Sequence, residues 1–79
     1  MAMQNYSIDQ LKVDLATNLK SVRLAKGLAQ EKLALEAGVD RTVVSKIERG
    51  VTNPSLEILL RLANFLDVQV SDLLNQKKL

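Results

Sequence analysis

The segment DRTVVSKIERG, residues 40–50, carries two kinds of side chain that a helix would place on opposite sides. At about 100° per residue, its polar residues share an arc of roughly 140°, and its apolar residues fall on the other side. The polar side chains donate hydrogen bonds and most are positively charged, so this face is suited to an anionic partner. The polar set is Arg41, Thr42, Ser45, Lys46 and Arg49, and the apolar set is Val43, Val44 and Ile47.

The side chains that most enzymes depend on are missing. The 79-residue chain contains no histidine and no cysteine, which removes the commonest general base, the commonest metal ligand and the best nucleophile. We therefore expect no enzymatic activity, no metal, no cofactor and no small-molecule ligand. The absence of disulfides fits a reducing cytoplasm. No stretch approaches 18 consecutive apolar residues, so we expect no membrane partner.

Positive charge is concentrated around this segment, although the net charge of the chain is only +2. Between residues 20 and 49 seven basic residues stand against four acidic ones, whereas residues 50–76 hold one basic and three acidic residues. This asymmetry favours a polyanion as partner. Charge alone also fits an ordinary solvated helix face. RNA or single strands are disfavoured, because their binding depends on stacked aromatics and Tyr6 and Phe65 are far apart in the sequence.

Caps, apolar spacing and helix breakers predict five helices. The leucine-rich composition, with three glycines and one proline, favours an all-α fold of helices packed on helices. A chain of this length makes one domain, which we take as residues 1–79 with frayed ends at 1–7 and 75–79. The expected helices span 8–26, about 30–37, 41–49, 56–66 and 70–74, with Ser7, Asp40, Ser55 and Ser71 as N-caps and Gly27, Gly38 and Gly50 at their ends.

Two of these helices have a core side that can be read from the spacing of apolar residues. Steps of three and four residues place such side chains on one face of a helix, and that face must be buried. The predicted core sides are Ile8, Leu11, Leu15, Leu19 and Val22 in the first helix, and Leu56, Leu59, Leu60, Ala63 and Leu66 in the fourth.

The second and third helices have the features of a helix-turn-helix unit. Ala34 is small enough to allow close approach, Gly38 permits a sharp turn, and Val44 and Ile47 supply an apolar seam. In that unit the second helix presents its outer face to the major groove of DNA, which admits one helix. The polar face of residues 41–49 would then contact DNA. The alternative is a helix of a generic bundle.

Residues 19–68 resemble the Cro/C1-type (XRE-family) helix-turn-helix domain in four motifs that occur in register. These are R-x-x-K-G-L-x-Q, L-A-x-x-A-G-V, S-K-I-E-R-G and N-P-S-L-E-x-L. The resemblance implies a compact five-helix, lambda-repressor-like domain with a family core at about 19–74. It also implies a homodimer that binds double-stranded DNA and regulates transcription. The stretch GVDRTVVSKIERG is similar to controller proteins of restriction-modification systems.

The resemblance assigns roles to individual residues. Arg41, Thr42, Ser45 and Lys46 would face base edges or the flanking backbone, while Gln30, Arg49 and Asn53 would contact phosphates. Arg23 and Glu48 match positions that form a buried ion pair, although Arg23 could instead contact a phosphate. The sequence departs from the family pattern at Ala29, where a Ser or Thr cap is usual, at Lys32, where an acid is usual, and at Asp67, where Gly is usual.

The function expected from these features is sequence-specific regulation of transcription by a dimer on an operator. Its location would be the cytoplasm, with the protein held on the nucleoid through DNA binding. The expected dimer interface is apolar and lies at the end of the fourth helix and in the fifth, at Leu66, Val68, Val70 and Leu74. The alternative is a protein-interaction module on the same fold, such as an antitoxin or a bridging coactivator.

Overall fold

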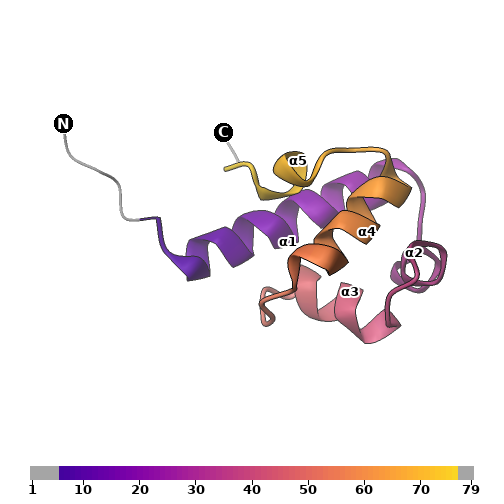
Figure 1. Ribbon diagram of the computed structural model, residues 1–79, viewed down its shortest axis with the longest axis horizontal. Coiled ribbons are helices and arrows are strands. Elements are labelled where there is room, and N and C mark those ends of the chain that lie inside the picture. Colours follow the sequence, from indigo (N-terminus) through magenta and orange to yellow (C-terminus); the bar gives the residue numbers. More distant parts are fainter. Residues whose placement is uncertain (1–5, 77–79) are drawn as a thin grey trace.

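The computed structural model describes residues 6–76, and five α-helices joined by short connections make up this part of the chain (Figure 1). The all-α prediction is confirmed. The fraying predicted for 1–7 and 75–79 falls mostly outside the described residues, but Ser7 caps the first helix, since its Oγ accepts the N–H of Gln10 at 3.0 Å. The helices are α1 (Ile8–Ala25), α2 (Gln30–Ala37), α3 (Arg41–Glu48), α4 (Leu56–Leu66) and α5 (Val70–Leu74).

α1 is the longest helix, and the others are arranged around its C-terminal two thirds (Figure 1). It packs against α3 and α5, while α2 packs against α3 and α4. Its first turns extend beyond the other helices, and Ile8 consequently remains 50% exposed although it lies on the predicted core side. None of the helices within residues 6–76 combines the length and the apolar character that crossing a membrane requires.

All five helices contribute to one aliphatic core. Burial of apolar surface has no directional preference, so the shapes of these side chains decide how closely the helices approach. Leu19, Leu33, Val44, Leu62, Leu66 and Leu73 are fully buried. The rest of the buried apolar set is Leu15, Ala34, Ile47, Leu59 and Ala63.

The core side of α4 differs from the prediction at two of its residues. Leu56 and Leu60 are 77% and 51% exposed, and Leu62, which the prediction omitted, is fully buried. The buried stripe of α4 runs through residues 59, 62, 63 and 66, which share a narrower arc than the predicted set. Leu56 and Leu60 lie on one flank of that arc, where residues 6–76 provide no helix to cover them completely.

α2 and α4 end at left-handed C-cap residues, which set the direction of the chain. Gly38 ends α2 with φ at +74°, a conformation that costs glycine nothing. Arg61 of α4 fixes this turn, because its Nη1 donates to the carbonyl of Gly38 at 2.9 Å. Asp67 ends α4 with φ at +59°, in the place where the family usually has glycine. A residue with a side chain adopts this left-handed conformation at a cost in free energy.

α5 spans the predicted residues 70–74, but its N-cap differs from the prediction. Ser71 lies inside the helix, and Gln69 is the N-cap. The cause is Asp72, whose Oδ2 accepts the backbone N–H of Gln69 at 2.8 Å and so stabilises the start of the helix there. The other end of α5 is held to α1, because Nδ2 of Asn18 donates to the carbonyls of Leu73 and Asn75 at 3.0 and 2.7 Å.

The missing cap of α2 leads to a first prediction. Ala29 has the extended backbone of an N-cap, with φ −75° and ψ 157°, but no side-chain oxygen to accept from the helix. Ala29→Ser adds that acceptor without a change of backbone. We expect the free energy of unfolding to rise by about 1 kcal/mol, measured by urea denaturation.

The matched control for this prediction removes an existing cap. Ser55 Oγ accepts the N–H of Ile58 at 3.1 Å, so Ser55→Ala should lower the free energy of unfolding by about 1 kcal/mol. If Ala29→Ser leaves the stability unchanged or lowers it while Ser55→Ala shows the expected loss, the missing side-chain cap does not limit the stability of α2.

Candidate nucleic-acid interface

The polar face of α3 points away from the core, as the helical spacing predicts. Arg41, Thr42 and Lys46 are exposed and Ser45 is half-buried. On the opposite side, Val44 and Ile47 are at most 1% exposed. Burial of the apolar seam therefore fixes the rotation of α3 about its axis, and its hydrogen-bond donors are left facing solvent.

α2 supports α3 through a short turn and a packed joint. Residues 38–40 connect the two helices, and the left-handed Gly38 lets α3 cross α2 rather than continue it. Leu33 and Ala34 of α2 are buried in the common core, and the small Ala34 permits close approach. A helix supported in this way from one side can insert its other side into a major groove about 12 Å wide.

Asp40 caps α3 and also engages Thr42. Its Oδ1 accepts the backbone N–H of Thr42 at 2.8 Å and the Thr42 hydroxyl at 2.7 Å. These two hydrogen bonds, assisted by the charges of Arg41 and Lys46, hold the pKa of Asp40 below its ordinary value. The hydroxyl hydrogen of Thr42 is thereby used within the chain, so Thr42 presents its methyl group and oxygen lone pairs to a partner.

Arg41 lies at the start of α3 and pairs with Glu31 in the first turn of α2. Its Nη1 donates to Oε2 of Glu31 at 2.8 Å, and both side chains are more than 70% exposed. The bond uses Nη1 and leaves the Nε–Nη2 edge of the guanidinium outside the pair. Two parallel donors on that edge match two neighbouring acceptors, such as O6 and N7 of guanine.

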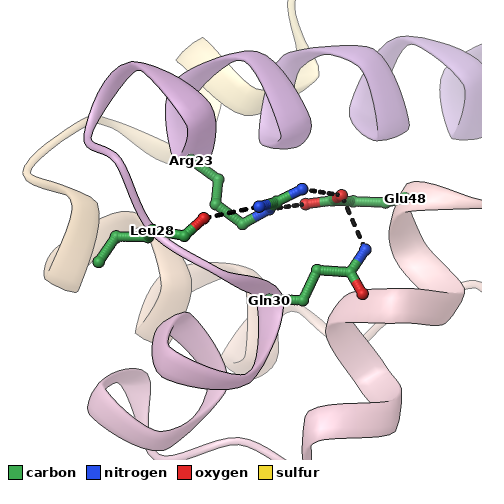
Figure 2. A network of polar contacts seen from close by, with 4 residues as sticks. All are labelled: Arg23, Leu28, Gln30 and Glu48. Carbon is green, nitrogen blue, oxygen red and sulfur yellow. Dashed lines mark hydrogen bonds and ion pairs between the residues drawn. The ribbon is translucent and has the colours of Figure 1, made fainter.

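Arg23 and Glu48 form a buried ion pair that joins α1 to the end of α3 (Figure 2). Nε and Nη2 of Arg23 donate to the two carboxylate oxygens of Glu48 at 2.7 and 2.9 Å, and Nη1 donates to the carbonyl of Leu28 at 2.6 Å. All three guanidinium nitrogens are thus engaged, and Arg23 is 7% exposed. This geometry fits the structural role of Arg23, because a side chain that is buried and bonded through all three nitrogens is poorly placed for the alternative role as a phosphate contact.

The environment of the pair favours the charged form of both partners. Burial opposes ionisation of Glu48, but hydrogen bonds from Arg23 and Gln30, with the charges of Arg23 and Lys20, outweigh it and lower the pKa of Glu48. The hydrogen bond to Glu48 raises the pKa of Arg23. The pair is therefore ionised at neutral pH, and neither charge is left without a partner.

The predicted phosphate contacts lie in three different settings. Nε2 of Gln30 donates to Oε1 of Glu48 at 3.0 Å, so its side chain is tied to the ion pair and keeps a second N–H for another acceptor (Figure 2). Arg49 is exposed directly after α3. Asn53 is exposed in the connection to α4, where it borders an apolar groove between α1 and α4.

The apolar residues assigned to the dimer interface are only partly available. Leu66 is buried in the chain's own core at 0% exposure, so it offers no surface to a second copy in this structure. Val68, Val70 and Leu74 are half-buried against the core. A groove of about 150 Å³ lies next to Leu74, and its lining also includes Ile8, Leu11 and Leu56.

Two residues of this region were not singled out from the sequence. Glu31 is ten residues away from its partner Arg41, and Arg61 is 23 residues away from its acceptor, the carbonyl of Gly38. Neither distance corresponds to a helical repeat, so periodicity gives no signal for these contacts. Glu31 could have been found only by considering which charges flank the predicted turn.

Within residues 6–76 no group of three or more Asp or Glu side chains converges as metal ligands would. Asp40 and Glu48 are both used inside the fold, one as a helix cap and the other in the ion pair. The exposed side of α3 instead offers hydrogen-bond donors, which fit a macromolecule rich in acceptors.

The buried ion pair leads to a second prediction. Glu48→Gln removes one charge and leaves Arg23 buried without its counter-charge, so we expect a loss of about 3 kcal/mol at pH 7. Because the folded pKa of Glu48 lies below the ordinary 4.5, the pair stabilises the wild type above that value and this contribution is lost as the pH falls through the folded pKa. The difference between wild type and Glu48→Gln should therefore shrink below about pH 4.5 in denaturation curves.

Glu36→Gln is the control, because it removes the same charge from an exposed pair. Glu36 lies 3.3 Å from Lys32 and both side chains are largely solvated, so the change should be below about 0.5 kcal/mol at every pH. Equal effects of Glu48→Gln and Glu36→Gln would contradict a structural role for the buried pair.

Comparison with known proteins agrees with this geometry. The model of the helix-turn-helix family HTH_3 matches residues 19–73. The transcriptional regulator SinR of Bacillus licheniformis is 41% identical over 64 residues, which are 80% of this chain and 58% of SinR, so the chain spans little more than half of that relative.

Two solved structures have the same fold. The restriction-modification controller protein C.AhdI from Aeromonas hydrophila is 44% identical, with a TM-score of 0.75, over 78% of this chain and 94% of that chain. SinR solved in complex with DNA is 39% identical, with a TM-score of 0.74, over 77% of this chain and 98% of that chain. The family model covers more than half of the sequence, and the protein belongs to this helix-turn-helix family.

Proposed function

We propose that this protein binds a specific site on double-stranded DNA and regulates transcription there. The observation that carries the proposal is the exposed donor-rich face of α3, held outward by the complete burial of Val44 and Ile47. Positive charge is concentrated in residues 20–49, which include this face. The similarity to SinR, which was solved with DNA, supports the same proposal.

In the proposed complex α3 lies in the major groove and α2 lies over the backbone. Arg41 reaches a guanine through the Nε–Nη2 edge that Glu31 leaves free. Thr42 offers its methyl group to a thymine, because its hydroxyl hydrogen is bound to Asp40. Ser45 and Lys46, one turn along the same face, reach the following base edges or the flanking backbone.

Contacts to phosphates set the position of α3 rather than the choice of sequence. Gln30 begins α2, where the helix N-terminus favours an anion, and its second Nε2 hydrogen is available for a phosphate oxygen. The other Nε2 hydrogen of Gln30 is donated to Glu48, and this bond orients the side-chain amide so that its nitrogen, rather than its oxygen, lies at the start of α2. Arg49 and Asn53 would contact phosphates after α3.

The proposed unit on DNA is a homodimer. α3 has eight residues and is about 12 Å long, so one copy reads only a few base pairs and two half-sites are needed for a specific operator. The exposed Leu56 and Leu60 of α4 and the half-buried Leu74 of α5 provide apolar surface for the second copy. With Leu66 buried, these residues replace it in the proposed interface, alongside Val68 and Val70.

Within the family, a small controller-type regulator is the subclass that the observations favour. The chain is 44% identical to the controller protein C.AhdI over 94% of that chain, and its stretch GVDRTVVSKIERG is similar to controller proteins. The alternative, a protein-interaction module, is favoured by Leu35 on the outer face of α2, which is 72% exposed. The salt dependence of binding to duplex DNA separates the two.

Salt dependence and operator variants test the proposed readout. Operators selected from random duplexes should bind with log K falling against log[salt] with a slope of about −5 to −7, because about six to eight phosphates are neutralised. Arg41→Ala should cost about 1–3 kcal/mol per half-site on the preferred operator, and much less on duplexes changed at one base position.

Gln30→Ala is the contrast to Arg41→Ala, because a phosphate contact carries no base identity. It should weaken binding to all duplexes by a similar factor. An equal loss on every operator variant in Arg41→Ala would contradict base readout by Arg41. A flat salt response of the wild type would favour the protein-interaction alternative.

The proposed dimer gives a separate test. Leu60→Glu introduces a charge into the apolar face of α4 and should shift the protein to monomer in sedimentation equilibrium at tens of micromolar. Leu35→Glu places the same charge on an exposed leucine of α2 and should leave the dimer intact. A wild type that stays monomeric both in solution and on the operator would refute the dimer.

A further inference from the structure

The pair between Glu31 and Arg41 joins the first turns of the two helices of the helix-turn-helix unit. Glu31 is the second residue of α2 and Arg41 is the first residue of α3, and their side chains meet at 2.8 Å across the exposed edge of the joint. Neither side chain is needed to complete the core, since they are 72% and 73% exposed. An acid in this place is unexpected for a surface that faces DNA, because it repels phosphates within a Debye length of about 8–10 Å.

The geometry of the bond shows what the acid can contribute. Glu31 accepts from Nη1, at one end of the guanidinium, and the Nε–Nη2 edge stays outside the pair. An arginine held in this way keeps its bidentate edge in a defined direction, whereas a free arginine samples many rotamers and loses that freedom on binding. An exposed carboxylate on the neighbouring helix therefore acts as a support for the arginine.

We propose that Glu31 is a positioning residue that determines specificity: it holds Arg41 for a base edge and keeps it from phosphates. The inference rests on the proposed DNA-binding function. When the guanidinium meets guanine, Nε and Nη2 bond the base while Nη1 keeps its bond to Glu31, so no interaction is exchanged. Phosphates flank the groove rather than lie on its floor, so in this proposal a contact with a phosphate turns the guanidinium out of the direction that Glu31 sets. The bond to Glu31 is then broken, and its charge is exposed to the backbone.

This arrangement increases the discrimination between the operator and other DNA rather than the affinity for the operator. A carboxylate that merely competed with guanine for the arginine would have to be displaced on the correct operator, and would gain no selectivity. If the carboxylate keeps its bond to the arginine on the operator, that bond is lost only in the non-cognate complex. The penalty for that loss is small for a solvated pair, of the order of up to fivefold in affinity per subunit.

The test uses Glu31→Gln in the full chain, with the selected operator and a scrambled duplex of equal length as probes. The scrambled duplex should bind Glu31→Gln more tightly than it binds the wild type, by up to about fivefold per subunit. For Glu31→Gln on the scrambled duplex, the slope of log K against log[salt] should also be steeper by about 0.9 per subunit, because Arg41 then neutralises one further phosphate. On the operator the slope should stay the same, so the affinity ratio between the two probes falls.

Glu36→Gln is the matched control for charge. Glu36 is also on α2 and also paired, but with Lys32, so its removal changes the overall field without releasing Arg41. It should raise affinity for both probes by a similar factor and leave their ratio close to that of the wild type. In an Arg41→Ala background, Glu31→Gln should behave as Glu36→Gln does, because the coupling between the two residues has been removed.

The outcomes separate this inference from the function on which it rests. If Glu31→Gln and Glu36→Gln have the same effect on the ratio, or if Glu31→Gln tightens the operator alone, Glu31 does not position Arg41 although the protein reads DNA. If the wild type binds the two probes equally and without salt dependence, both the proposed function and the role of Glu31 are overturned.

Discussion

The buried ion pair between Arg23 and Glu48 is the interaction on which the rest of the arrangement depends. An aliphatic core makes helices associate but does not by itself fix their register, because leucine and valine side chains contact one another in many ways. A buried arginine and a buried carboxylate are stable only with all their partners in place. The bidentate geometry of this pair, with a third bond to Leu28, therefore allows one position of α3 relative to α1.

The same pair connects the fold to the proposed interface. Glu48 ends α3 and accepts from Gln30 at the start of α2, so α1, α2 and α3 meet at one carboxylate. Because the ion pair fixes which side of α3 faces the core, it also fixes which side faces outward. The exposed polar side chains of Arg41, Thr42 and Lys46 are thus a consequence of burial on the opposite face. Their position relative to α2 is set by the Glu48 carboxylate, whose side chain is only 3% exposed.

Two residues at helix ends, Ala29 and Asp67, are less favourable for stability than the residues that the family usually has there. Asp40 supplies α3 with a cap and keeps Thr42 in place, whereas Ala29 gives α2 no cap at all. The left-handed Asp67 is a second place where a more favourable residue type exists. Both departures from the family pattern lie outside the exposed face of α3, and their effects are on the free energy of folding.

The sequence by itself determined the local structure of this protein, and the tertiary structure decided which flanks are covered and which charges meet. Ser7, Asp40, Ser55 and Gly38 mark helix ends because capping and left-handed turns depend on neighbouring backbone groups only. The apolar seam of α3 could likewise be read from its period.

Periodicity gives the centre of a buried face but not its width, which depends on how many neighbours surround the helix. Leu56 and Leu60 were for this reason assigned to the core and lie exposed, while Leu66, which was assigned both to the core side of the fourth helix and to an interface, lies inside. The partners of Arg41 and Arg61 were not foreseen, since they are brought close only by the crossing of α2, α3 and α4. The Arg23–Glu48 pair could be anticipated only from the resemblance to a family, because nothing local relates two residues 25 positions apart.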